Sequence, residues 1–133
     1  MKEKKTFQDY KYLVVEDQKD ARAMCRNLLA ELGVTQVFEC PNGREALTFV
    51  DAAVELVDII ICDWNMPEMS GMDFLKQLRT VYPDMPFLMV TGRNDMDSVI
   101  EAKGYGVNAY IAKPYSSTQL EAKLRVVAHR MQE

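Results

Sequence analysis

The segment from Val57 to Gly71 constrains the fold of this chain most, because an apolar run in it ends abruptly in an acid. Four apolar residues at 59–62, three of them β-branched, predict a short strand buried on both faces. Asp63 ends the run, and the Trp-Asn-Met-Pro that follows cannot continue the strand, whereas Ser-Gly-Met-Asp at 70–73 has the form of a helix start. We therefore expect Asp63 at the carboxyl end of a central strand, the edge where parallel α/β sheets bind ligands.

A loop carboxylate that only caps the next helix is the simpler interpretation of Asp63. Glu16 and Asp17 weaken that interpretation, because they end another apolar run in the same way.

Length and composition indicate one globular domain with its own core. The 133 residues suffice for a core without disulfides or metals, and the net charge of -4 argues against non-specific binding to nucleic acid. Cys25, Cys40 and Cys62 lie in apolar segments without a C-x-x-C pair, which predicts buried free thiols in a reducing compartment. No apolar segment resembles a signal peptide or a membrane span, so we expect a cytoplasmic protein. The expected organisation is a short N-terminal tail over 1–10 and one domain over 11–133, with no effector domain.

Five segments predicted as strands alternate with five predicted helices. The strands are expected over 12–16, 35–40, 59–63, 86–91 and 107–112. Such alternation demands an α/β fold with a parallel sheet covered on both faces.

The predicted helices have apolar stripes of unequal quality. The first is expected to bury a stripe that includes Met24, and the third a stripe that includes Val81. The fourth, over 94–103, is the poorest, because only Met96, Val99 and Ile100 form a stripe. The last begins with a capping-box pattern at 116–119.

Polar residues follow the predicted strands at the strand-to-helix connections. These residues are Glu16, Asp17, Asp63, Thr91 and Lys113. Because all these connections lie at one edge of a parallel sheet, residues far apart in the sequence are expected to be neighbours there.

Such an edge concentrates negative charge. Each carboxylate pair at ~4 Å costs roughly 4 kcal/mol at an effective dielectric of about 20, so the acids must share protons, pair with a cation or bind a metal. Lys113 can neutralise one charge, and oxygen-only ligands favour a hard divalent ion such as Mg²⁺. His129 is expected to face solvent on the last helix, away from this edge.

These motifs together resemble the receiver domain of two-component response regulators. The resemblance rests, in chain order, on Glu16-Asp17, Cys-Asp-Trp-Asn-Met-Pro-Glu-Met-Ser-Gly at 62–71, Thr91-Gly92, Tyr110 and Lys113-Pro114. The segments 64–67 and 113–124 are similar in particular to the single-domain, CheY-like chemotaxis regulators. The resemblance implies a flavodoxin-like, doubly wound fold with strand order 2-1-3-4-5 and helices on both faces.

The resemblance also implies roles for single residues. Asp63 would accept a phosphoryl group from the phosphohistidine of a histidine kinase. Mg²⁺ would be bound by Asp17, Asp63 and the backbone carbonyl of Asn65, with Glu16 acting mainly through a metal-bound water.

Other implied roles concern the phosphoryl group after transfer. Thr91 and Lys113 would contact its oxygens, and Tyr110 would turn inward as Thr91 moves. Asn65 and Arg93 would tune the lifetime of the phosphorylated state. We hypothesise that Arg93 alters autodephosphorylation, so that Arg93→Ala would change the decay rate of the phosphorylated protein.

The function implied is a monomeric phosphoacceptor switch rather than an enzyme with external substrates. Its protein target, in chemotaxis, would bind the face formed by the fourth helix, the fifth strand and the last helix. A phosphorelay carrier, a phosphate sink and a non-phosphorylated interaction module remain alternatives. A flavin site is disfavoured because the acidic loop at 16–20 would repel FMN phosphate, and an aspartyl phosphatase because Asn65 stands where its second Asp is needed.

Overall fold

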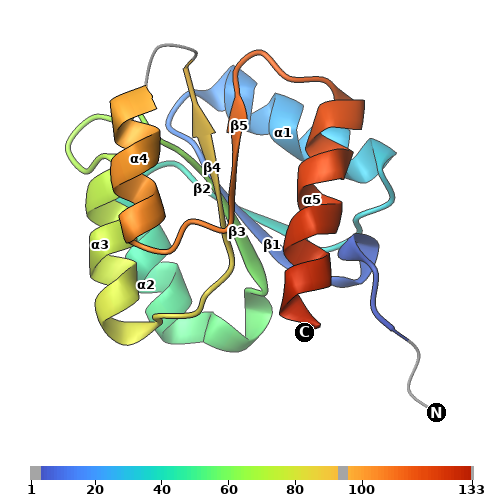
Figure 1. Cartoon of the computed structure of the whole chain (residues 1–133), viewed down its shortest axis with the longest axis horizontal. Helices are drawn as coiled ribbons and strands as arrows, with labels where there is room; N and C mark the ends of the chain where they lie inside the picture. The colour runs from blue at the N-terminus through green and yellow to red at the C-terminus, as the bar shows by residue number, and fades with distance from the viewer. Residues whose placement is uncertain (1–3, 93–95, 133) are drawn as a thin grey trace.

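The computed structural model describes residues 4–92 and 96–132, and it has the expected flavodoxin-like architecture (Figure 1). Five parallel strands form one sheet in the order β2-β1-β3-β4-β5. The strands are β1 (Tyr12–Val15), β2 (Val37–Cys40), β3 (Ile59–Asp63), β4 (Phe87–Thr91) and β5 (Ala109–Ala112). The helices are α1 (Lys19–Glu31), α2 (Gly43–Ala53), α3 (Gly71–Val81), α4 (Met96–Gly104) and α5 (Ser117–Met131), with short 3-10 helices η1 (Phe7–Asp9) and η2 (Val54–Leu56).

Most strands are shorter than the sequence predicts, because each extends only where a neighbour pairs with it. β2 begins at Val37, which lies opposite Tyr12 at the start of β1, so 35–36 precede the ladder. β5 begins at Ala109, opposite Leu88.

Helices cover both faces of the sheet, and successive side chains of its strands point to opposite sides. Leu13 and Val15 of β1 belong to one core, which they share with residues of α2, α3 and α4. Tyr12 and Val14 belong to a second core, which they share with residues of α1 and α5. Figure 1 shows these two helix layers on either side of the sheet.

Four of the residues that the apolar stripes place in the core are instead exposed. They are Met24 at 45%, Val81 at 62%, Met96 at 57% and Ile100 at 66%. Val81 is the last residue of α3, which ends just before Pro83.

α4 is attached to the core through only two of its described residues. Val99 and Ala102 are buried, whereas Ile100, Glu101 and Lys103 face solvent. The weak stripe read from the sequence therefore corresponds to a loosely packed helix.

The segment over 1–10, expected to be a tail, is partly built into the domain. Phe7 and Tyr10 are buried, and the backbone carbonyl of Phe7 accepts a hydrogen bond from the Tyr12 hydroxyl at 2.6 Å. η1 packs on α5 and so closes the lower end of the second core. No helix in the described part of the chain combines the length and apolarity needed to cross a bilayer.

Candidate functional site

The polar residues that end the strands meet at one edge of the sheet, as expected. Asp63 is the last residue of β3 and Thr91 the last of β4. Glu16 and Asp17 directly follow β1, and Lys113 follows β5. Since β1, β3, β4 and β5 are consecutive neighbours in the sheet, these five side chains come from four adjacent strand ends.

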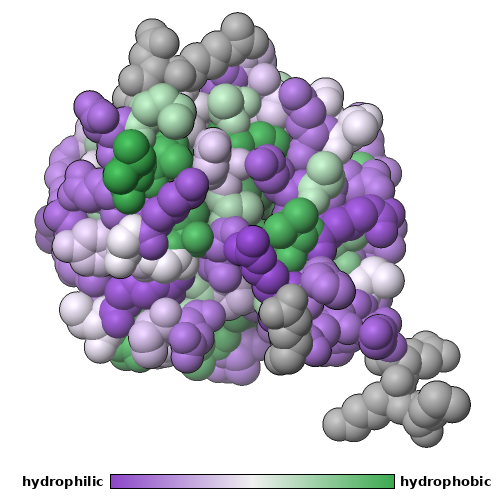
Figure 2. Space-filling view, in the orientation of Figure 1, coloured by the Kyte–Doolittle hydropathy of each residue, from purple (hydrophilic) through white to green (hydrophobic). Residues whose placement is uncertain are grey.

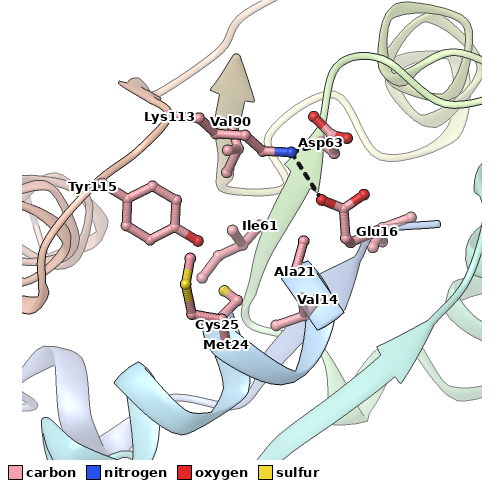
Figure 3. A pocket seen from close by; sticks show the side chains of 11 residues that line it. Val14, Glu16, Ala21, Met24, Cys25, Ile61, Asp63, Val90, Lys113 and Tyr115 are labelled. Carbon is pink, nitrogen blue, oxygen red and sulfur yellow. Dashed lines mark hydrogen bonds and ion pairs between the residues drawn. The ribbon is translucent and has the colours of Figure 1, made fainter. Parts of the chain in front are cut away.

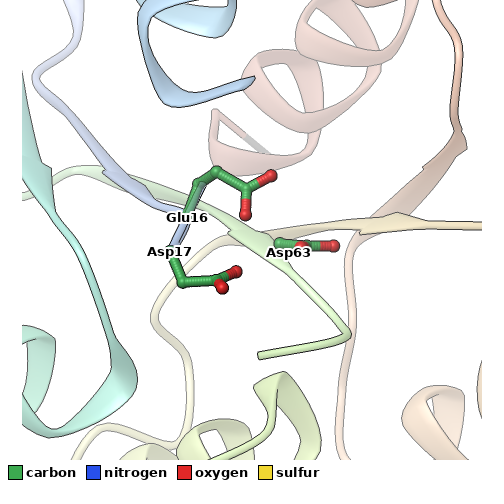
Figure 4. Close-up of side chains that lie close together, drawn as sticks. All are labelled: Glu16, Asp17 and Asp63. Carbon is green, nitrogen blue, oxygen red and sulfur yellow. The ribbon is translucent and has the colours of Figure 1, made fainter. Parts of the chain in front are cut away.

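Three carboxylates form the centre of the site (Figure 4). Glu16, Asp17 and Asp63 each offer an oxygen, and these oxygens lie within 4.8 Å of one another. Glu16 and Asp63 are only 5% and 7% exposed, so water screens their repulsion poorly.

Asp17 has the least satisfied carboxylate of the three. Its Oδ1 atom is buried and has no hydrogen-bond partner among the described residues. Burial, and then the neighbouring Glu16 carboxylate, raise the pKa of Asp17 above its ordinary value. A buried anionic oxygen without a donor, beside two further carboxylates, is an environment that a hard divalent cation would satisfy, so the residues present fit Mg²⁺.

Lys113 supplies the positive charge at this edge. Its Nζ donates to Glu16 Oε1 at 2.9 Å and lies 3.3 Å from Asp63 Oδ2. Burial alone would lower the pKa of Lys113, but the hydrogen bond to Glu16 and the charges of Asp63 and Glu16 together raise it. The backbone N–H of Lys113 donates to the Thr91 carbonyl at 2.8 Å, which ties the loop after β5 to the end of β4.

The loop after Asp63 is fixed at both ends by backbone hydrogen bonds. Trp64 donates to the Val90 carbonyl at 2.8 Å, and Gly71 donates to the Trp64 carbonyl at 2.9 Å. The Ser70 hydroxyl accepts from Asp73 N and caps α3, as its sequence pattern predicts. The side of the loop that carries Asn65 is exposed to solvent.

Two residues expected to take part in switching lie in different surroundings. Thr91 is 3% exposed, and its hydroxyl donates to the Gly92 carbonyl at 3.3 Å. Tyr110 is partly buried on β5, and the ammonium groups of Lys103 and Lys123 lie 5.7 and 5.2 Å from its ring centroid. Arg93, expected to tune the phosphoryl lifetime, lies outside the described residues.

An apolar cavity of about 60 Å³ beside the carboxylates was not anticipated from the sequence (Figure 3). Its walls come from β1, β3, β4, α1 and the loop after β5, and Lys113 and Glu16 lie at its edge. Tyr115 and Cys25 face each other across it. Only the position of Tyr115 two residues after Lys113 could have indicated that its side chain borders the site.

Comparisons with known proteins point to one family. Residues 12–125 match the family model of the response regulator receiver domain. The chemotaxis protein CheY1 of Helicobacter pylori is 40% identical over 119 residues, which cover 88% of this chain and 95% of that protein. The chemotaxis protein CheY of Pseudomonas aeruginosa is 36% identical over 123 residues, which cover 91% and 98%. The crystal structure of chemotaxis protein CheY4 of Vibrio cholerae superposes with a TM-score of 0.80 at 33% identity, covering 89% of this chain and 98% of that one.

Proposed function

The chain belongs to the response regulator receiver family, the phosphoacceptor switches of two-component systems, and we propose that Asp63 is its phosphoacceptor. The observation that supports this assignment most is the position of Asp63. Among the residues that the structure describes, it is the one carboxylate that ends a central strand, lies beside Asp17 and Glu16, and has an ammonium group 3.3 Å away.

The divalent ion would be Mg²⁺, held by Asp17, Asp63 and the backbone carbonyl of Asn65. When bound, it would neutralise charge on the phosphoryl oxygens and bring the donor close to the acceptor. The partnerless Oδ1 of Asp17 supports its assignment as a ligand.

The transfer itself requires a nucleophile and charge neutralisation. An Asp63 carboxylate oxygen attacks the phosphorus atom, the bond from phosphorus to the imidazole nitrogen of the donor histidine breaks, and that nitrogen leaves with the electron pair. Lys113 keeps a positive charge beside the attacking carboxylate and then pairs with a phosphoryl oxygen. The Thr91 hydroxyl, at the neighbouring strand end, donates to another.

The new charge would change the conformation of the face formed by α4, β5 and α5. Phosphorylation adds about two negative charges and new acceptor oxygens, toward which Thr91 can move. Tyr110, in the strand beside it, then turns inward.

This face also has the character of a protein-binding surface. Figure 2 shows apolar patches over α4 and α5 with hydrophilic residues between them. Its exposed apolar residues include Met96, Ile100 and Val126. A hollow of about 360 Å³ beside Tyr110 is bordered by three cationic side chains: Lys103, Lys123 and Arg130. These features support a downstream partner that presents apolar and acidic groups.

The relatives support a role in chemotaxis, since proteins named for chemotaxis match 88% or more of the chain. A histidine kinase is the phosphodonor that such a role requires. The kinase and the downstream target are to be identified by binding experiments with the phosphorylated and unphosphorylated protein.

Trp64 offers a direct test of the proposed acceptor. It is the single tryptophan of the chain, it is buried, and it follows Asp63. Its fluorescence should change on addition of Mg²⁺ and change again on addition of acetyl phosphate. In Asp63→Asn the second change should be absent, and intact-mass measurement should find one phosphoryl group on the parent only.

The opposite results would overturn the proposal. If Asp63→Asn acquires the phosphoryl group as fast as the parent, another residue is the acceptor. If neither Mg²⁺ nor acetyl phosphate has any effect on the parent, the acidic edge is structural, and the protein acts as a non-phosphorylated interaction module.

A further inference from the structure

The two adjacent acids after β1 are in different states of hydrogen bonding. Both carboxylate oxygens of Glu16 are engaged, because Oε1 accepts from Lys113 Nζ at 2.9 Å and Oε2 accepts from the backbone N–H of Gln18 at 3.3 Å. Asp17, next to it, has a buried oxygen without a partner among the described residues. Glu16 is therefore committed to protein donors, whereas Asp17 is available to a cation.

Lys113 is bound more closely to Glu16 than to the proposed acceptor. Its ammonium lies 2.9 Å from Glu16 Oε1 but 3.3 Å from Asp63 Oδ2. The Glu16 side chain is 7% exposed and that of Lys113 is 36% exposed, so one end of this pair is dry while the other reaches solvent. Without Glu16, the ammonium group could leave Asp63 for water.

The apolar cavity favours the pairing of Lys113 with Glu16. Lys113 borders the cavity together with mostly apolar side chains, and Glu16 and Asp63 are the only charged acceptors among the residues that line it (Figure 3). The low polarity on that side also reduces the screening of the Glu16–Lys113 attraction. Glu16 and Asp63 are the two carboxylates that border the cavity, and both contact Lys113.

We propose that Glu16 is a positioning residue, which holds the Lys113 ammonium beside Asp63 before the phosphoryl group arrives and leaves the divalent cation to Asp17 and Asp63. The inference rests on the proposed function and deepens it. A glutamate suits this task because its arm is one methylene longer than that of aspartate, and that length spans the distance from the end of β1 to the ammonium group. A pre-positioned ammonium lowers the reorganisation needed during transfer.

The ammonium group itself provides a test that needs no phosphorylation. In ¹⁵N-detected spectra of lysine side chains, the Lys113 signal, assigned by its loss in Lys113→Arg, should exchange slowly with water. Glu16→Gln keeps the size of the side chain but removes its charge, and should speed this exchange by at least about tenfold, as a lost charge-assisted hydrogen bond implies. Asp17→Asn is the matched control and should leave the exchange rate within about twofold. If the signal is unchanged in Glu16→Gln but lost in Asp63→Asn, Asp63 holds the lysine and the proposal is wrong.

A double-mutant cycle tests whether Glu16 acts through Lys113 in the reaction. The rate of phosphorylation by acetyl phosphate is measured at saturating Mg²⁺, so that weaker ion binding does not contribute. In the parent background, Glu16→Gln should lower this rate at least about fivefold. In the Lys113→Met background it should lower the rate less than about twofold, because the lysine that Glu16 positions is already absent. Equal slowing in both backgrounds would show that Glu16 acts on the ion or the acceptor directly. Failure of the parent to be phosphorylated would overturn the proposed function, while the exchange measurement would still decide the role of Glu16.

Discussion

Gly71 is the residue at which the start of α3 comes closest to the end of β3. A Cβ atom at this position would lie 2.5 Å from the Asp63 carbonyl oxygen and 2.9 Å from Trp64 Cα, both of them backbone atoms that cannot turn aside. Close approach of two backbone segments is therefore what requires glycine here. The geometry of the proposed acceptor depends on a residue that has no side chain.

Gly71→Ala should disturb both stability and the site. Overpacking of this kind costs about 1–3 kcal/mol, and the displaced Asp63 backbone should slow phosphorylation by acetyl phosphate. Urea unfolding and the Trp64 signal measure the two effects. Gly104→Ala is the control, because nothing lies within 4 Å of the added carbon, and a helical Gly→Ala change should be neutral or stabilising by about 0.5–1 kcal/mol. Similar losses in both variants would contradict the steric explanation.

The buried cysteines should make stability fall at alkaline pH. Burial raises the pKa of Cys25 and that of Cys40 to about 11, from an ordinary value of 9.0. Between these values the unfolded chain loses its thiol protons while the folded chain keeps them, so unfolding becomes more favourable as pH rises. The unfolding free energy should drop more between about pH 9 and pH 11 in the parent than in Cys25→Ala/Cys40→Ala. Equal drops would show that these thiols do not cause the pH dependence.

At the level of the elements, hydrogen bonds from α3 hold the C-terminal end of α4. Arg79 of α3 donates from Nε to the Tyr105 carbonyl and from Nη2 to the Gly106 carbonyl, both at 2.8 Å. A third bond, at 3.0 Å, goes to the Tyr82 carbonyl. Since α4 buries few of its own side chains, this one guanidinium holds the end of the helix that borders the proposed output face.

Arg79→Ala should loosen α4 selectively. Losing several charge-assisted hydrogen bonds should cost about 2 kcal/mol and should speed amide exchange over 102–107 more than in α3. Lys76→Ala is the matched control on the same helix, because its exposed ion pair with Glu101 and its contact with the Tyr105 ring are each worth at most about 1 kcal/mol. If exchange over 102–107 is as slow in Arg79→Ala as in the parent, the packing of Val99 and Ala102 is sufficient to hold α4.

For the whole molecule, the acidic edge lowers stability in the absence of a cation and provides the ability to bind one. Asp17 is an acid whose folded-state pKa is raised, so its ionisation opposes folding as pH rises above its unfolded value of 3.8. In chelator, Asp17→Asn should therefore unfold at a higher temperature than the parent. Added Mg²⁺ should reverse the order, since an ion at about 100 times its Kd stabilises the parent by roughly 2.7 kcal/mol.

Thermal unfolding with and without Mg²⁺ measures this reversal. Asp97→Asn serves as the control, because Asp97 is an exposed acid in the first turn of α4, outside the cluster. It should respond to Mg²⁺ as the parent does. If Asp17→Asn is less stable than the parent in chelator, Asp17 has a protein partner that stabilises its charge.

Local patterns in the sequence were enough to predict the α/β class and which polar residues gather at one edge of the sheet, whereas the strand order came from the family resemblance. Alternating strand and helix signals require a parallel sheet, and a parallel sheet brings every strand-to-helix connection to one edge, so Asp63, Thr91 and Lys113 could be predicted to meet. The ends of the strands and the residues that each helix buries were less predictable. Strand ends depend on where a neighbour pairs, and the exposure of Val81 and Ile100 depends on how their helices pack in the folded chain.

The tertiary structure alone decided which acid pairs with which partner. Glu16 and Asp17 are adjacent in sequence and equal in charge, yet one is bound by Lys113, 97 positions away, and the other keeps an oxygen without a donor. The cavity beside them and the inclusion of Phe7 in the core are likewise products of packing between distant segments. The physical reason is that strand order sets which residues become neighbours, whereas side-chain reach and burial, which exist only in the folded chain, decide which of those neighbours bind.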